Sequence, residues 1–442
     1  MTTDLTKGKP WRVILLYTLP IIAGNMFQQL YSMVDTLIVG RTMGSDALAA
    51  VGSTTTIVYF VLCFIQGLTT GFSVITGQRF GSGDPDGIRQ SAGISTVLCV
   101  LFSVILTAVT VLLCDPILRL MNTPSDIFQY SHEYLIVIFI GTGATVFYNM
   151  ISNLLRSLGD SRTPLLFLIV SSLLNVFLDI LFIVPFHMGV AGAAWATILS
   201  QLLSAVLCLV YALKKFPLLR LSRRELTFHG HLAAVHLKMG FPMGLQMSVM
   251  CIGQLAMQSF GQRARNHSHC RIYCSSKLDQ FAVQINNAYC TSSAGDVAQN
   301  FGAGDRERIR NGSSCALLQA IIISLSVGLL MIASRSLRSL CFWIILNRSS
   351  TLMHPGFCFS PCLFIRCSAF FVYTASSALQ SMNRAAYPFI ACLIELVLRL
   401  ISSLGLSRIW GFTMICLSSP FAWIGAAIFL AAGYFHVMRA KN

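Results

Sequence analysis

Two aspartates lie inside long apolar stretches of this 442-residue chain. Asp35 is in the stretch 11–40, and Asp179 is in the stretch 164–186. A charged side chain in the hydrocarbon region of a membrane is costly, so it usually faces a cavity and marks the path of an ion or a proton. The two carboxylates are therefore the first candidates for chemistry.

An amide and a hydroxyl accompany these carboxylates. Asn175 precedes Asp179 by four residues, so the two side chains share one face of a helix. Thr197 lies eight residues into the next apolar stretch, 190–213, which returns across the membrane and brings Thr197 near the level of Asp179. Oxygens of these types suit a proton or a hard monovalent cation such as Na⁺, and they do not resemble a zinc or copper site. We therefore expect a coupling ion here, and neither a resident metal nor another cofactor.

The direction of the two stretches sets the depth of the carboxylates. If the N-terminus is cytoplasmic, both stretches run outward, and Asp35 lies five residues before Gly40 while Asp179 lies six residues before Pro185. Both acids then lie in the outer half of the first lobe, where they can hold one proton between them and release it when the site opens to the other side. The alternative interpretation is structural, with each aspartate hydrogen-bonded to hydroxyls between packed helices.

The composition agrees with a membrane protein built from helices. Of all residues 55% are hydrophobic and 11% are charged, whereas a soluble domain carries about 25% charged residues. The polar start of the chain has no small-residue cleavage site, so we expect the first stretch to be an uncleaved anchor. Six stretches of the first half exceed the ~20 residues that a helix needs to cross the bilayer: 11–40, 47–76, 91–114, 132–156, 164–186 and 190–213.

The formal net charge of +15 is distributed unevenly. With a cytoplasmic N-terminus, thirteen basic residues of the first half and of the connector 214–238 fall on the cytoplasmic side, against Arg41 and Arg119 on the other side. Basic residues are enriched in the cytoplasmic loops of membrane proteins. The charge therefore indicates orientation in a plasma membrane of bacterial type, with the N-terminus in the cytoplasm, and does not indicate a nucleic-acid partner.

One motif occurs twice, 221 residues apart. Gln78–Arg89 and Gln299–Arg310 agree at seven of twelve positions, and both lie between long apolar stretches. Six spans per half make both copies enter the membrane in the same direction, and parallel repeats of this kind enclose the substrate path of transporters. We therefore predict an all-α membrane protein of twelve transmembrane helices in two six-helix lobes related by pseudo-two-fold symmetry, with an N-lobe at 1–213, a basic cytoplasmic connector at 214–238 and a C-lobe at 239–442.

The Phe-Gly-x-Gly-Asp core of the repeated motif has a structural explanation. Its glycines suit the left-handed turn that ends a helix, and Asp84 or Asp305 suits the cap of the next helix. Pro85 stands where the first helical residue is expected. The spacing matches neither the Walker motif nor the dinucleotide motif, so we favour a structural role over phosphate binding.

The second half carries further polar residues in its apolar stretches. Glu395 and Arg399 are four residues apart, which favours a salt bridge within one helix. A polar stripe around 277–287 either lines the central path or packs between helices. Four residues of this half are weaker candidates for contact with substrate: Gln246, Gln280, Gln284 and Asn287.

Together these motifs resemble the multidrug and toxic compound extrusion (MATE) family. The resemblance rests on Pro20 followed by fourteen residues and then Asp35, on the paired Phe-Gly-x-Gly-Asp loops, and on the segment 155–160. It covers the first half and returns in patches in the second. It implies an antiporter, not an enzyme, that expels drug-like organic cations in exchange for H⁺ or Na⁺ by alternating access.

The resemblance also assigns roles to residues and favours the DinF-like branch. In that branch the cation site uses an Asp of the first helix, an Asn and an Asp of the fifth and a Thr of the sixth. The NorM-like branch instead relies on C-lobe carboxylates, including one in the seventh helix, and the stretch 242–250 has none. The matching residues are Asp35, Asn175, Asp179 and Thr197, with Tyr134 of the fourth helix as a weaker member.

Parts of the second half depart from the family's pattern. The segments 260–276, 289–296 and 336–376 are irregular, and eleven of the fifteen cysteines lie in this half. A zinc site from the histidines and cysteines at 267–274 fits no zinc spacing known to us. We favour a local reading-frame error, because with one choice of synonymous codons a one-base shift of 269–276 restores the small apolar residues that the family has there.

Two other functions share some of these features. A flippase for lipid-linked saccharides has the two-lobe plan, but it needs cationic side chains in the cleft to hold pyrophosphate, and the spans of the first half carry almost none. An intramembrane enzyme needs a motif such as Gly-x-Gly-Asp within a span, whereas here the motif is in loops. We predict a monomer in the lipid bilayer whose partners are small organic cations or drugs. The substrate and the choice between Na⁺ and H⁺ stay open, because the same oxygens serve both ions.

Overall fold

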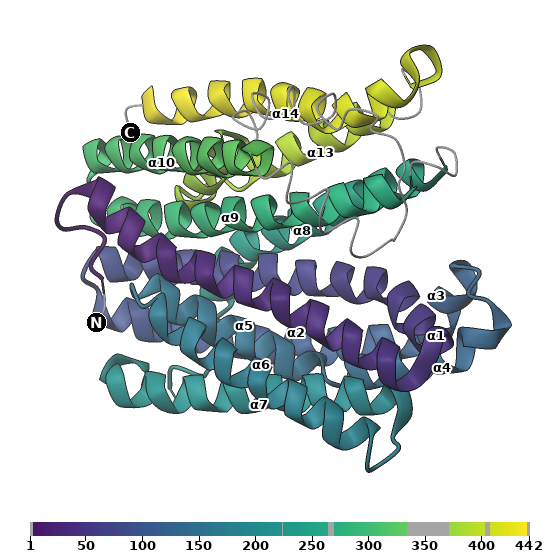
Figure 1. Ribbon diagram of the computed structural model, residues 1–442. Coiled ribbons are helices and arrows are strands. Elements are labelled where there is room, and N and C mark those ends of the chain that lie inside the picture. The colour runs from purple at the N-terminus through teal and green to yellow at the C-terminus, as the bar shows by residue number, and fades with distance from the viewer. Residues whose placement is uncertain (1–2, 223, 264–268, 334–370, 403–406, 440–442) are drawn as a thin grey trace.

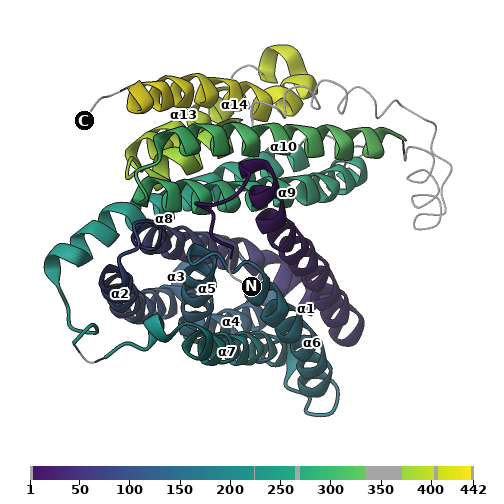
Figure 2. The same ribbon diagram turned by 90° about the vertical axis from the view of Figure 1, so that its left-hand side faces the viewer.

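The computed structural model describes residues 3–222, 224–263, 269–333, 371–402 and 407–439. These residues are mostly helical, and no strand occurs among them. Figures 1 and 2 show two groups of long helices side by side. The first group contains α1 (Pro10–Gly81), α2 (Pro85–Leu112), α3 (Cys114–Leu120), α4 (Ser125–Ile140), α5 (Thr142–Ser157), α6 (Arg162–Ile183) and α7 (Gly189–Lys215). The second contains α8 (Gly230–Arg263), α9 (His269–Gly302), α10 (Arg306–Ala333), the helical residues 371–381, α13 (Ala386–Leu400) and α14 (Ser407–Arg439).

The helix α1 carries the first two spans. It is interrupted at Gly44, whose φ of 86° takes the backbone out of the helical conformation. The parts on either side, Pro10–Gly44 and Ala49–Gly81, are each long and apolar enough to cross a membrane. Pro20 lies inside the first of these spans, where it has no N–H to donate to the preceding turn.

Six helices among the described residues pass this test of length and apolarity, or seven if one bent pair counts as a span. The bent pair is α4 and α5, which meet at Gly141 with an angle of 46° in the region where we expected one span at 132–156. A side chain at Gly141 would collide with Ile198 of α7. Glycine therefore lets α7 pack directly against the bend.

Apolar side chains divide between the interior of each group and the outer surface. Leu68 and Leu155 are fully buried in the first group, and Leu379 is fully buried in the second. Other large apolar side chains, such as Leu173 and Ile428, are exposed. Helices with apolar outer faces and internally bonded backbones suit the hydrocarbon of a bilayer.

The repeated motif has the same backbone in both copies. Gly83 and Gly304 have left-handed φ values of 66° and 76°. Asp84 accepts from the backbone N–H three residues on at 2.9 Å, and Asp305 does so at 2.8 Å. Pro85 is the first residue of α2. The predicted structural role of the motif is confirmed.

A second pair of turns follows the same symmetry. Gly159, after α5, has a φ of 84°, and Asn383, after the helix 371–381, has a φ of 62°. Glycine and asparagine are the residues that most readily adopt this conformation. The duplication seen in the first motif thus extends to a second turn, at 157–160 and 381–384.

Asp160 anchors the turn between α5 and α6. Its buried carboxylate accepts from the Thr163 N–H at 3.1 Å, the Thr163 hydroxyl at 2.8 Å and the Lys215 Nζ at 2.8 Å. Burial raises the pKa of Asp160, but the hydrogen bonds from Lys215 and Thr163 lower it by more, so the pKa lies below that of a free aspartate. The ionised form therefore stabilises the fold at neutral pH.

We expect Asp160→Asn to lower the free energy of unfolding by about 2 kcal/mol at neutral pH, since hydrogen bonds to charged groups contribute about 1.5–3 kcal/mol. Because the pKa of Asp160 is lower in the folded than in the unfolded state, its contribution is complete above about pH 4 and is lost as the pH falls through the folded-state pKa. The effect of the substitution should shrink accordingly in acid. Thermal unfolding of the purified protein over a pH series measures this, with the exposed Asp86→Asn as a matched control. An equal loss at neutral and acid pH would contradict it.

The start of α1 and the end of α14 lie at one end of the bundle, at the left in Figure 1. The turn at 157–160 is at the same end, because the Thr3 N–H donates to the Gly159 carbonyl at 2.9 Å. Arg79 and Arg156 are in the last turns of helices that finish there. We call it the basic end.

Candidate functional site

The two aspartates singled out in the sequence meet in the structure. The helix α1 brings Asp35 and α6 brings Asp179, and the two carboxyl groups lie close enough to interact electrostatically. Asp179 is fully buried and Asp35 is half-buried. Carboxylate oxygens only accept, so a direct hydrogen bond between two carboxyl groups needs a proton on one of them. The arrangement therefore suits a pair that shares one proton.

Asn175 and Thr197 lie beside the pair, as their spacing predicted. Asn175 is buried on α6, one turn before Asp179. With its amide nitrogen turned toward Asp179, Asn175 donates to Oδ2 at 2.9 Å and accepts from the Thr197 N–H at 3.2 Å. The Asn175 side chain thus links α6 and α7 at the level of the acids.

Two tyrosines complete the cluster. Tyr134, the weaker candidate, lies on α4 close enough to interact electrostatically with both acids. Tyr31 was not predicted; it lies close enough to Thr197, Asp35 and Asp179 to interact with all three. The sequence did contain a clue to Tyr31: it lies four residues before Asp35, so the two side chains share one face of α1.

The cluster has unused capacity for an ion. Oδ1 of Asp35 and Oδ1 of Asp179 are both buried and have no hydrogen-bond partner. A buried oxygen without a partner is costly, and a bound proton or cation removes that cost. Together with the amide and hydroxyl oxygens of Asn175 and Thr197, these atoms form the donor set that a hard monovalent cation prefers.

The zinc site considered from the sequence involves other residues than this site. Among the residues whose side chains the structure describes, no three histidine, cysteine, aspartate or glutamate side chains form a possible metal cluster. The side chains at 267–274, which suggested zinc, lie outside the described residues. The irregular segment 289–296 lies within α9, and Tyr289, Ser292 and Asp296 are buried there.

Comparison with known proteins agrees with this architecture. The MatE family model matches residues 20–181. The chain is 34% identical to the probable multidrug resistance protein YpnP of Bacillus subtilis over 69% of this chain and 68% of that protein. The chain belongs to the MatE family. It is also 30% identical to the probable multidrug resistance protein YoeA of the same organism, over 59% of this chain and 58% of YoeA.

Solved structures share the fold of this MatE transporter. A crystal structure of MATE in complex with MaL6 has a TM-score of 0.87 at 20% identity, with 99% of each chain covered. An outward-facing multidrug resistance MATE transporter of the MOP superfamily has a TM-score of 0.85 at 20% identity, covering 100% of this chain and 99% of that one. The all-α fold of twelve helices in two lobes is the MATE fold, so the predicted fold class is confirmed. As a member of this family the chain is a transporter and not an enzyme.

The four weaker candidates of the C-lobe differ in their surroundings. Gln246 of α8 is buried, and its Oε1 accepts from Gln380 at 2.7 Å. Gln284 and Asn287 are half-buried on α9, and the Gln284 carbonyl accepts from Asn25 of α1 at 3.0 Å. The side chain of Gln280 lies outside the described residues. Contact of these residues with substrate stays a prediction.

The C-lobe of this MatE transporter also contains a buried ion pair. Arg399 donates directly to Glu395, one turn earlier on α13, which confirms the predicted intrahelical salt bridge. The indole N–H of Trp423 donates to the same Glu395 oxygen at 3.1 Å, and the guanidinium lies 6.0 Å from the centre of the indole ring. The glutamate therefore has two donors, from α13 and α14.

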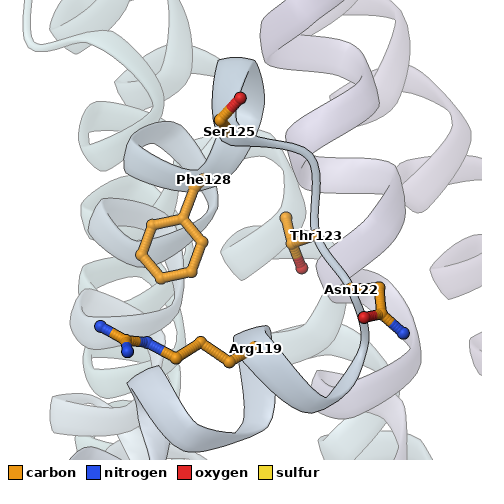
Figure 3. Close-up of a pocket in the computed structure, with 5 residues that line it drawn as sticks. All are labelled: Arg119, Asn122, Thr123, Ser125 and Phe128. Carbon is orange, nitrogen blue, oxygen red and sulfur yellow. The ribbon is translucent and has the colours of Figure 1, made fainter.

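A surface hollow lies at the turn between α3 and α4 (Figure 3). Its lining contains no acid, and it comes from different elements than the Asp35–Asp179 pair of α1 and α6. We assign it no part in transport. Its lining residues are Arg119, Asn122, Thr123, Ser125 and Phe128.

Proposed function

We propose that this chain is a multidrug exporter that expels drug-like organic cations in exchange for H⁺ or Na⁺ bound at the Asp35–Asp179 pair. The observation that carries the proposal is that these two carboxyl groups lie close together inside membrane-spanning helices, each with a buried oxygen that has no partner. A pair of buried acids is costly in an apolar bundle, and intramembrane acids mark ion paths. The names of YpnP and YoeA, both probable multidrug resistance proteins, support a drug as the exported substrate.

The coupling follows from charge and geometry. A cation or proton that reaches the pair from outside satisfies the orphan oxygens and changes the contacts among α1, α6 and α7. Each elementary charge that enters yields about 2.3 kcal/mol per 100 mV of membrane potential. Since about 1.4 kcal/mol is a factor of ten, one or two charges can support an outside concentration about ten to a thousand times the inside one. No nucleotide is then needed.

The proposal also covers the orientation of the chain in the membrane, its branch of the family and its oligomeric state. We place the basic end in the cytoplasm of a bacterial-type inner membrane, with a cytoplasmic N-terminus, because basic residues concentrate there. The acid pair is in the N-lobe, and 242–250 of α8 contains no carboxylate, which supports the DinF-like branch. The two lobes of one chain enclose the path, so we propose a working monomer.

The test is efflux of a fluorescent organic cation from cells that lack their own drug pumps. Cells that make this chain should lose the dye faster than cells with an empty vector, and an uncoupler or removal of Na⁺ should abolish the difference. Whichever treatment abolishes it identifies the coupling ion. Equal dye loss with and without the chain, at proven membrane abundance, would overturn the proposal.

A further inference from the structure

Two equivalent glutamines of the repeated motif each reach across to the opposite lobe. Gln78, at the end of α1, donates to the Ser381 carbonyl at 2.7 Å and to Asn383 Oδ1 at 3.1 Å. Gln299, at the end of α9, donates to the Ser157 carbonyl at 2.9 Å. Ser157 and Ser381 occupy equivalent positions in the second pair of repeated turns, 157–160 and 381–384. The two bonds are therefore related by the pseudo-two-fold axis of the duplication.

The glycines next to these glutamines bring the two copies into backbone contact. A methyl group at Gly81 would run into the Gln299 carbonyl, and a methyl group at Gly302 would run into the Gln78 carbonyl. The contact is again symmetric, because Gly81 and Gly302 are the first glycines of the two Phe-Gly-x-Gly-Asp loops. Glycine permits such close approach of two helices.

The contact between the lobes continues from the basic end into the membrane. A methyl group at Gly71 of α1 would lie 2.5 Å from the Gly240 Cα of α8. One turn further along α1, a methyl group at Gly67 would clash with the Met243 carbonyl. The lobes are thus in backbone contact along α1 and α8 on this side of the molecule.

The segment before α1, which contains Leu5, also bonds to the second copy of the motif. The Leu5 N–H donates to Gln299 Oε1 at 3.0 Å, and the Leu5 carbonyl accepts from Arg308 Nη2 at 3.0 Å. Leu5 is fully buried, although it precedes the first helix. Figure 2 shows the start of the chain between the two groups of helices.

We propose that the two copies of the Gln-x-Phe-Gly-x-Gly-Asp motif form the gate between the lobes at the basic end, with Gln78 and Gln299 as its symmetric latches. The proposal rests on the proposed function, since a gate serves alternating access. In the present structure the gate is closed. Opening breaks the Gln78–Ser381 and Gln299–Ser157 bonds and separates Gly81 from Gln299 and Gly302 from Gln78. The aspartates of the motif cap the helices that follow it, whereas its glutamines take no part in these caps and bond across the gate.

The test measures how often the gate opens, without relying on drug transport. Cys290 lies on α9, nine residues before Gln299, and its thiol bonds to the Ser377 hydroxyl at 2.7 Å. In membrane vesicles of both orientations, a membrane-impermeant maleimide is added, and labelling of the Cys290 peptide is followed by mass spectrometry. We expect the double variant Gln78→Ala Gln299→Ala to label about tenfold faster than the parent chain from the basic side only, because the closed state loses the hydrogen bonds of both glutamines across the lobes.

The controls separate a gate from general damage. Gln90→Ala removes an exposed glutamine near the same end, and it should label at the parent rate. Gly302→Ala should accelerate labelling through its clash with the Gln78 carbonyl, whereas Gly52→Ala, where no atom lies near the added methyl group, should not. Parent-like labelling of both the double variant and Gly302→Ala, with unchanged thermal unfolding, would overturn the gate. Failure of dye export with accelerated labelling would count against the proposed substrate and leave the gate supported.

Discussion

Replacing Asp35 or Asp179 by asparagine should abolish dye export while the protein still reaches the membrane. Asparagine has the size of aspartate, but it can neither release a proton nor neutralise a cation. The exchange then loses its driving energy of about 2.3 kcal/mol per charge per 100 mV, so we expect export against a gradient to fall at least about tenfold. Efflux from pump-deficient cells at matched membrane abundance measures this.

The effects should follow the geometry of the site. Tyr31→Phe keeps the ring and removes only the hydroxyl, while both acids stay, so its effect should be smaller than that of either asparagine variant. Asp126→Asn, at an exposed position in the first turn of α4, is the matched control and should export like the parent chain. If Asp35→Asn and Asp179→Asn both export at the parent rate, the pair is a structural contact and ion coupling must lie elsewhere.

The proximity of the two acids could be predicted because it depends only on the direction of their spans and on the helical period. Two spans that run in the same direction place Asp35 and Asp179 at one depth, and the period of the helix places Asn175 beside Asp179. Thr197 follows from the length of the turn before α7. Tyr31 was missed because a tyrosine in an apolar stretch looks like any other aromatic side chain of a membrane helix, although its spacing from Asp35 was informative.

The bend and the gate could not be predicted in the same way. The break of α4 and α5 at Gly141 depends on how closely Ile198 of α7 approaches, which no local pattern contains. The turns and helix caps of the repeated motif were predicted correctly, because they depend on residues that are neighbours in the chain. Its contact across the lobes depends on docking of two halves that are 221 residues apart in the sequence. Symmetry of the sequence shows that two copies exist, but it does not show that they touch.

The buried ion pair of the C-lobe should contribute strongly to the free energy of unfolding. Arg399→Met leaves Glu395 buried with the Trp423 indole as its remaining donor. Removing one partner of a buried pair costs about 3–5 kcal/mol, because the other charge stays without compensation. We therefore expect a marked fall in the midpoint of thermal unfolding, measured on the purified protein in detergent. The exposed Arg162→Met is the matched control and should change the midpoint little.

The double variant Glu395→Leu Arg399→Met decides what the pair does. Replacing both partners of a buried pair by apolar residues is often neutral for stability, so the double variant should recover most of the loss. A double variant as unstable as Arg399→Met would contradict the pairwise account. If the stable double variant still exports dye, the pair serves only the packing of α13 against α14. If it is stable and inactive, the C-lobe contributes a charged element to transport in addition to the acids of the N-lobe.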